Sequence, residues 1–207
     1  MKDYLSKLQT IAWRTSGARY NAYRRLKRRE FFSTLSLAIF SAASAAIAFV
    51  QKVYAQPNSA MDRYFTAASV CIGVVLLAIS LIEWGSANGA KAENLFANAE
   101  LLNEFHRKVE LFLVRLNVEG SLSWAEVEGL NGEYEAIKSR CNNNHEPIDD
   151  LVFLAQKRRA PEFKYLKLEG LKIAGYYFYW YFISFSYFAV LWLVLSFSLV
   201  YPFVKWG

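Results

Sequence analysis

Cysteine, histidine and proline are scarce in this chain of 207 residues, which holds two, two and four of them. Cys71 falls inside a long apolar run and Cys141 in a polar segment, so a disulfide framework of the kind that stabilises small secreted domains is excluded. His106 has no second histidine nearby and no cysteine at the spacing of a zinc site, and His145 lies equally isolated in a polar loop. We therefore expect no bound metal and no cofactor.

Signatures of catalysis are also missing. The segment 85–89 contains two glycines, but it lacks the Gly-Lys-Ser/Thr ending of a phosphate-binding loop, and the spacing of the glycines suits a bend or a close approach of helices. A Cys–His nucleophile pair stays open as an alternative, although Cys141 lies on an apolar helical stripe that favours burial. We expect no catalytic residue and no enzymatic activity.

Charge is absent from three long runs, residues 31–50, 64–82 and 173–204. The chain is 55% hydrophobic and 17% aromatic, which is too apolar for a soluble domain of this size unless the apolar residues are concentrated in such runs. Each run meets the roughly 20 residues that a helix needs to cross a bilayer, and only helices satisfy the backbone of such segments in lipid. The pattern predicts an all-α membrane protein with three transmembrane helices.

The third run exceeds the length of one crossing, but aromatic residues bound a shorter segment within it. An unbroken aromatic block occupies residues 176–182, and Tyr201, Phe203 and Trp206 surround Pro202. Such belts mark the two membrane interfaces. The intervening residues 183–200 make about 27 Å of helix, which is one crossing.

Positive charge predicts that the N-terminus is cytoplasmic. Nine lysine and arginine residues precede the first run, whereas only Lys52 and Arg63 lie between the first two runs. No persuasive cleavage site follows the first run, so we interpret it as a retained span. This topology, together with anionic lipid, accounts for the net charge of +6, so we expect no direct binding of nucleic acid.

These patterns divide the chain into eight segments. They are a cytoplasmic amphipathic helix at 1–29, a span at 30–53, an external loop at 54–63, a second span at 64–84, a cytoplasmic helical hairpin at 85–141, a cytoplasmic loop with short helices at 142–172, a third span at 173–204 and an external tail at 205–207.

An apolar stripe spaced alternately by four and three residues follows the second span, and it is typical of a coiled-coil seam. It consists of Leu95, Ala99, Leu102, His106, Val109, Leu113 and Leu116. Ser123 and Glu126 then form a capping box at the start of a second predicted helix. We predict an antiparallel hairpin, and we assign the seam as a candidate contact between the subunits of a homo-oligomer.

Small and polar residues line one face of each of the first two spans. The candidates are Ser33, Ser36, Ser44 and Gln51 in the first span and Thr66, Ser69, Gly73 and Ser80 in the second, with Glu83 at the cytoplasmic mouth. At 100° per residue, the four in the second span fall within about 60° of one another. Two interpretations stay open: these residues allow helices to pack closely, or they line an oligomeric pore. The third span lacks such a stripe, and we expect it to face lipid.

Seven short stretches carry a likeness to a known family. They are Trp13-Arg14-Thr15, Ala18-Arg19-Tyr20-Asn21-Ala22, Arg25-Leu26, Ala92-Glu93-Asn94-Leu95, the helix Tyr134 to Ile137, Asn144-His145 and Ile148-Asp149. Together they resemble the SLATT family, the SMODS and SLOG-associating transmembrane effectors, and most of all its reverse-transcriptase-linked branch. The resemblance covers roughly the first 155 residues, and the third span exceeds the two-helix core of that family.

This resemblance implies an effector of a prokaryotic anti-phage system that acts by abortive infection. Such a protein oligomerises in the bacterial inner membrane and permeabilises it when a cytoplasmic sensor detects infection. The sensor is expected to be encoded nearby, as a reverse transcriptase or a nucleotide-signalling component. The alternative function is a non-conducting membrane anchor whose cytoplasmic hairpin recruits a soluble partner.

Overall fold

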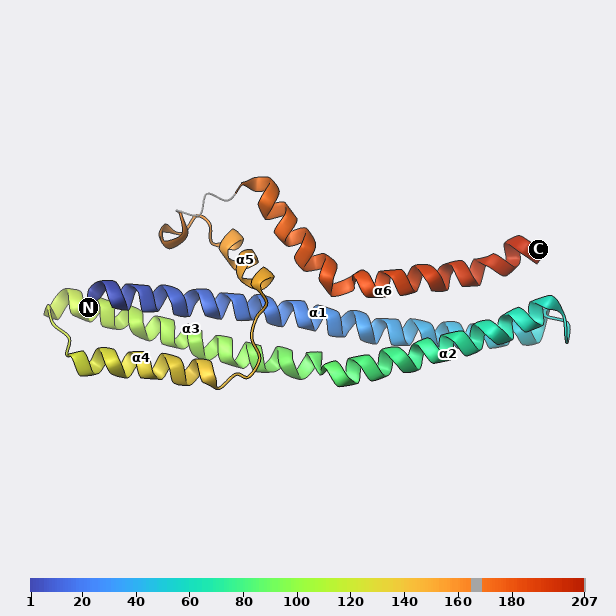
Figure 1. Cartoon of the computed structure of the whole chain (residues 1–207), viewed down its shortest axis with the longest axis horizontal. Coiled ribbons are helices and arrows are strands. Elements are labelled where there is room, and N and C mark those ends of the chain that lie inside the picture. Colours follow the sequence, from blue (N-terminus) through green and yellow to red (C-terminus); the bar gives the residue numbers. More distant parts are fainter. Residues whose placement is uncertain (165–168, 207) are drawn as a thin grey trace. The chain divides into compact units, whose positions relative to one another are not determined.

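A computed structural model describes residues 1–164 and 169–206, except for the side chains of Glu119, Phe203 and Trp206. Two residues of the predicted C-terminal aromatic belt, Phe203 and Trp206, are therefore outside the described side chains. The regular elements in these ranges are α1 (Lys2–Tyr54), α2 (Ala60–Ser86), α3 (Asn88–Glu119), α4 (Trp124–Ser139), α5 (Pro147–Gln156), the short 3-10 helix η1 (Pro161–Phe163) and α6 (Gly170–Trp206) (Figure 1). The predicted all-α fold class is confirmed.

Helices α1, α2 and α6 each contain a segment long and apolar enough to cross a membrane. The predicted amphipathic helix and the first span form one continuous helix, α1, which passes through Gly17 without a break. Helix α2 begins at Ala60, because the hydroxyl of Ser59 accepts a hydrogen bond from the backbone N–H of Asp62 at 3.1 Å and caps the helix. Residues 55–59 therefore connect α1 to α2.

A bend separates α2 from α3. Helix α2 ends at Ser86, Ala87 adopts the left-handed conformation with φ of 47°, and α3 begins at Asn88. Left-handed backbone at a non-glycine residue is uncommon and ends a helix. The bend lies within the Gly85–Gly89 segment, where the sequence predicts one.

The helices form two compact units. We call Met1–Lys27 with Gly89–Tyr181 the head unit, and Arg28–Asn88 with Phe182–Gly207 the span unit. Helices α1 and α6 each contribute residues to both units.

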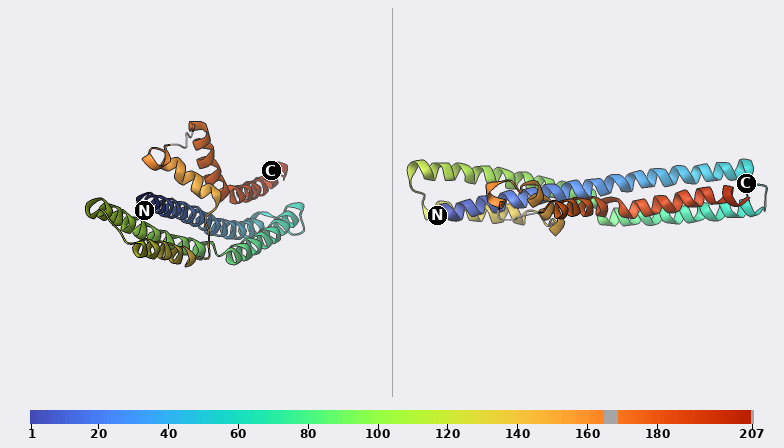
Figure 2. Two further views of the ribbon diagram at one scale, coloured as in Figure 1. Left: turned by 60° about the vertical axis from the view of Figure 1, so that its left-hand side comes forward. Right: turned by 90° about the horizontal axis from the view of Figure 1, so that it is seen from above.

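The head unit is organised around α3, which lies antiparallel to both α1 and α4. Two contacts on each side show these directions: Gln9 with His106 and Ser16 with Ala99 for α1, and Lys108 with Glu133 and Arg115 with Glu126 for α4. Figures 1 and 2 show α3 running alongside α1. The buried core comprises Leu5, Leu8, Ala12, Leu102, Phe105, Val109, Leu122, Val127, Leu130, Tyr134 and Ile137. The predicted capping box of Ser123 and Glu126 is present, as is the antiparallel hairpin of α3 and α4.

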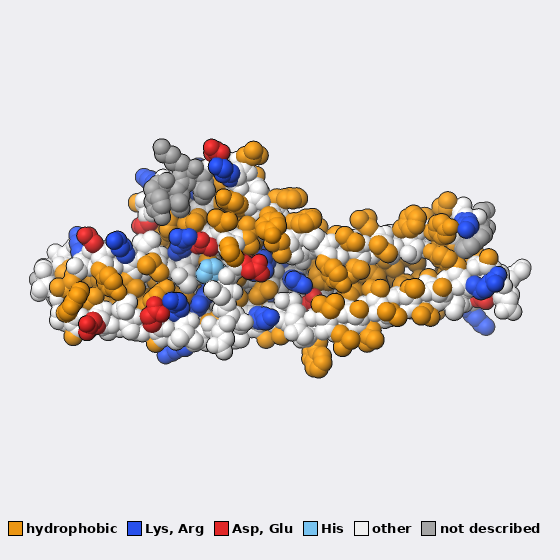
Figure 3. Space-filling view, viewed as in Figure 1, with side chains coloured by type: hydrophobic (Ala, Val, Ile, Leu, Met, Phe, Trp, Pro, Cys, Tyr) orange, Lys and Arg blue, Asp and Glu red, His pale blue; other side chains and the backbone are white. Residues whose placement is uncertain are grey.

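The span unit packs α1, α2 and the C-terminal part of α6 together. Its buried residues are Phe40, Ile47, Phe65, Ile72 and Leu195. The indole N–H of Trp192 donates to the hydroxyl of Ser36 at 2.9 Å, and the hydroxyl of Tyr64 donates to the carbonyl of Ser198 at 2.7 Å. On the face shown in Figure 3, hydrophobic side chains cover most of α2 and α6, and charged ones gather near the loop between α1 and α2. The third span thus contacts both other spans, while Val190, Leu193 and Phe197 on the same helix are exposed, and that this exposed side faces lipid stays a prediction.

Candidate functional site

The candidate pore-lining residues of the first span differ in burial. Ser33 and Ser36 are buried, and Ser36 accepts the bond from Trp192 while it donates to the carbonyl of Phe32 at 2.6 Å. Ser44 is half-buried. The structure therefore places Ser33 and Ser36 inside the span unit of a single chain, where Ser36 binds α6.

Three candidates of the second span face outward. Thr66, Gly73 and Ser80 are exposed at intervals of seven residues, so they lie along one side of α2. Both hydroxyls donate to their own helix, Thr66 to the carbonyl of Asp62 and Ser80 to the carbonyl of Leu76. We call Thr66, Gly73 and Ser80 the open face of α2. Ser69 is half-buried, and its hydroxyl oxygen is without a hydrogen-bond partner in the part of the chain that the structure describes.

Polar contacts lie at both ends of the pair formed by α1 and α2. Near the loop, the amide of Gln51 donates to Asp62 at 2.7 Å and to Thr66 at 2.9 Å, which joins one predicted residue from each span. At the other end, Glu83 accepts from the amide of Asn88 at 3.1 Å and lies 3.9 Å from Arg29. The side chain of Glu83 is only 14% exposed, so it is engaged within one chain.

The predicted oligomer seam is also engaged within one chain. Leu95, Ala99, Leu102 and Val109 are buried, and Leu113 and Leu116 pack against the same core, which α1 and α4 complete. His106 is half-buried, with its Nδ1 at 3.3 Å from the carbonyl oxygen of Gln9 and its ring stacked on Trp13. Oligomerisation stays a prediction, but this stripe is not the open surface it would require.

The loop after α4 carries Cys141 of the Cys–His alternative and His145, one of the two histidines of the chain. Helix α4 ends at Ser139, so Cys141 lies beyond the helix on which the sequence places it. Its thiol donates to the carbonyl of Asn143 at 3.2 Å. His145 is half-buried, and burial is the main cause that lowers its pKa.

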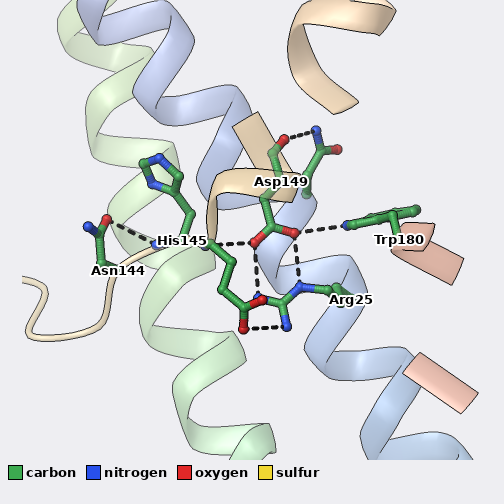
Figure 4. Close-up of polar contacts among 7 residues, drawn as sticks. Arg25, Asn144, His145, Asp149 and Trp180 are labelled. Atoms are coloured by element: carbon green, nitrogen blue, oxygen red, sulfur yellow. Dashed lines mark hydrogen bonds and ion pairs between the residues drawn. The ribbon is translucent and has the colours of Figure 1, made fainter. Parts of the chain in front are cut away.

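Asp149 of α5 is a highly connected polar group of the head unit, and the sequence indicated it only as one of the residues of the family likeness. Its side chain is fully buried, yet it accepts hydrogen bonds from Arg25 Nε and Nη2 at 3.0 Å each and from the indole of Trp180 at 2.9 Å (Figure 4). It also accepts from the backbone N–H of Glu146 at 2.9 Å, which completes a capping box at the start of α5. One carboxylate therefore joins α5 to α1 and to α6.

Further contacts around Asp149 involve Arg25, Glu146 and Asn21. Arg25 forms a second ion pair with Glu146 at 3.0 Å, and Asn21 donates to the backbone carbonyl of Asp149 at 3.0 Å. Burial alone would lower the pKa of Arg25, but its hydrogen bonds to Asp149 and the charges of Asp149 and Glu146 raise that pKa above its ordinary value. We call Asn21, Arg25, Glu146, Asp149 and Trp180 the Asp149 node.

Nothing in the local sequence distinguishes this node chemically. Arg25 is one of several basic residues before the first span, and Trp180 is one of seven consecutive aromatic residues. Only the family likeness included both Arg25 and Asp149, without a physical role for either.

Residues 1–202 match the family described as SMODS and SLOG-associating 2TM effector domain family 5. The chain belongs to this family. It is accordingly a membrane effector of defence systems, associated by its family name with SMODS and SLOG systems, which agrees with its apolar helices. The family description counts two transmembrane helices, whereas the described part of this chain contains three candidates. No curated protein and no solved structure matches the chain.

Proposed function

We propose that the protein is a pore-forming effector of anti-phage defence, whose copies assemble in the inner membrane and open it on a cytoplasmic trigger. The observation that carries this proposal is the open face of α2. A membrane-spanning helix that presents Thr66, Gly73 and Ser80 outward offers small and hydroxyl-bearing residues to another helix or to water.

The energetics of this face suit a pore that forms only after assembly. The hydroxyls of Thr66 and Ser80 bond to their own backbone, so a single chain presents them to lipid at little cost. Gly73 leaves room for close approach, because no atom outside its chain neighbours and the adjacent helix backbone lies within 4 Å of the position its Cβ would occupy. In an assembly, the same side chains line a ring of α2 helices. Ser33 and Ser36 are excluded from this ring because they are buried.

The head unit supplies the link from trigger to pore. The Asp149 node binds α5 to α1 and α6, and both of these helices continue as membrane spans. A trigger that displaces α5 therefore acts on two spans at once. We place the head unit and the N-terminus in the cytoplasm, as the positive charge of residues 1–29 predicts.

The open face is tested by replacing Thr66, Gly73 and Ser80 together with leucine. The matched control places leucine at Val74, Ala78 and Ile82, which are exposed at the other edge of the same helix. Each variant is expressed with its neighbouring genes, insertion is confirmed, and membrane potential is recorded after triggering. We expect the first variant to keep the potential intact and the control to dissipate it like the wild type.

Two results would overturn the proposal. One is an intact potential in triggered cells that contain the inserted wild-type protein. The other is equal loss of potential with both triple variants, because the open face would then have no part in conduction.

A non-conducting anchor is the second candidate, and exposed apolar side chains of the head unit favour it. Leu111, Val114 and Val118 lie on one side of α3 at 56% exposure or more, and Trp124 at the start of α4 is 64% exposed. Exposed apolar surface of this kind mediates protein contacts. Replacing Leu111, Val114 and Val118 with serine should abolish recruitment of a soluble partner if anchoring is the function, while the open-face variant should retain it.

A further inference from the structure

A cleft of about 420 Å³ lies in the head unit between α1, α3 and α5. Its volume falls in the range of small-molecule sites. Gly17 of α1 and the ring of Phe153 on α5 both line it, and they are in such close contact that a Cβ at Gly17 would lie 2.0 Å from the ring. The cleft is therefore formed where α5 packs directly on the backbone of α1.

Several side-chain hydrogen-bond donors line the walls of this cleft. Trp13, Arg24 and Asn103 contribute N–H groups, and Arg24 is exposed. Lys157 also lines it and lies over the ring of Trp13 at 5.8 Å. An occupant that carries several acceptors would form hydrogen bonds with these donors.

The charges of the lining favour an anion. Arg24 and Lys157 are cationic, and the one carboxylate of the lining, Glu100, already accepts a hydrogen bond from the hydroxyl of Tyr20. Burial, together with that bond and the charge of Glu100, raises the pKa of Tyr20, so the phenol stays protonated and neutral. A guanidinium such as that of Arg24 binds carboxylate and phosphate groups through two parallel bonds.

The remaining walls are flat and apolar. Trp13, Tyr20 and Phe153 contribute aromatic rings to the lining, and such rings favour the stacked or edge-on packing of another ring. The occupant that fits both features has a flat ring and an anionic group.

We propose that this cleft binds a small organic anion, in which a flat ring carries a phosphate or carboxylate group, and that Arg24 and Lys157 hold its charge. The cleft adjoins the Asp149 node. Gln156 lines the cleft and donates to Asn21 at 3.3 Å, and Asn21 donates in turn to the carbonyl of Asp149. Binding therefore acts on the docking of α5, and its role as a trigger rests on the proposed function.

Fluorine NMR of the purified full chain in detergent tests the binding directly. The probes are para-fluorophenyl phosphate, para-fluorobenzoate and the neutral para-fluorobenzyl alcohol, each followed by line broadening. We expect the two anions to bind, and Arg24→Gln to weaken them roughly tenfold, as the loss of a charged hydrogen-bond donor predicts. The matched control is Lys7→Gln, an exposed cation of α1 outside the cleft, which should leave binding unchanged.

The comparison of probes decides the chemistry. Stronger binding of the phosphate or of the benzoate identifies the anionic group that the cleft prefers. Two results would represent uptake by the micelle and overturn the proposal. One is equal broadening of the anion signals with the wild type and with Arg24→Gln. The other is anion broadening no greater than that of the alcohol.

A second measurement separates binding from conduction. The same probes are added to the head-unit side of liposomes that contain the protein, and dye leakage is recorded. Binding without leakage keeps the site but removes its role as a trigger. The neighbouring gene products can also be added to these liposomes. If they induce equal leakage with Arg24→Gln and with the wild type, the site has no role as a trigger, but the proposed pore remains.

Discussion

Asp149 of α5 and Arg25 of α1 form a two-bond ion pair across 124 positions of sequence, with both N–H···O distances at 3.0 Å. The carboxylate is fully buried, and Arg25 is 5% exposed. A buried pair is stable only when its remaining donors and acceptors are also bonded. Trp180 and the backbone of Glu146 meet that requirement here, so the pair fixes α5 in one position against α1 and α6.

Asp149→Asn should destabilise the head unit by about 3 to 5 kcal/mol, because it leaves Arg25 buried with a weaker partner. The adjacent Asp150 offers a matched control. It pairs with Arg14, whose side chain is 43% exposed, so Asp150→Asn should cost below about 1 kcal/mol. Thermal unfolding in detergent, followed by circular dichroism, measures both. Equal midpoints for the two variants would contradict a structural role for the Asp149 node.

Gly17→Ala should undock α5. The added Cβ would lie 2.0 and 2.1 Å from two ring atoms of Phe153, which is buried and must move, and such overpacking costs about 1 to 3 kcal/mol. Gly132→Ala on α4 is the control, because no atom lies within 4 Å of its Cβ position and alanine favours a helix by up to about 1 kcal/mol. The two substitutions should shift the unfolding midpoint in opposite directions. A stabilised Gly17→Ala would show that Phe153 does not pack there.

Acidification should destabilise the head unit through His145. Burial lowers the pKa of His145 below its ordinary value of 6.5, against the opposing charges of Asp150 and Asp149, while Arg19 and Arg14 lower it further. The unfolded chain then takes up this proton at a higher pH than the folded chain. Stability therefore falls as the pH drops below about 6.5, until the folded state is also protonated.

Unfolding midpoints measured between about pH 7 and about pH 5 test this dependence. His145→Gln removes the titrating group and should flatten the profile over that interval. An unchanged slope in this variant would assign the effect to other groups.

The parts of the fold that sequence predicts are those that depend on local pattern. Charge-free runs identified the spans, because lipid excludes charge, and Ser123 with Glu126 identified the start of α4. The stripe through Leu102 and Val109 was correctly interpreted as apolar packing, but a stripe does not specify its partner, which proved to be α1 and α4 of the same chain.

The residues that sequence missed depend on distant contacts. Asp149 meets Arg25 and Trp180 only because three separate helices converge. Ser36 was grouped with the pore candidates because it shares a helix face with Ser44, and pattern alone cannot show that Trp192 occupies that face. The open face of α2 was predictable, since its members lie on one side of a single helix.

Ser36 and Trp192 should show a coupling energy that demonstrates packing of the third span on the first. Ser36 is fully buried, and its hydroxyl accepts the indole N–H at 2.9 Å, so Ser36→Ala leaves that donor without an acceptor inside the span unit. Hydrogen bonds between membrane helices contribute about 0.6 kcal/mol on average and up to about 1.7 kcal/mol. A double-mutant cycle consists of Ser36→Ala, Trp192→Phe and the variant that carries both. The double variant should lose less free energy of unfolding than the two single variants together, by about that amount. Unfolding in mixed micelles with increasing denaturing detergent measures the three differences in free energy of unfolding.

Ser198→Ala on α6 is the control, because the hydroxyl of Tyr64 donates to the backbone carbonyl of Ser198 and not to its side chain. Strictly additive effects would show that Trp192 does not contact Ser36 in the membrane and would contradict packing of the third span on the first.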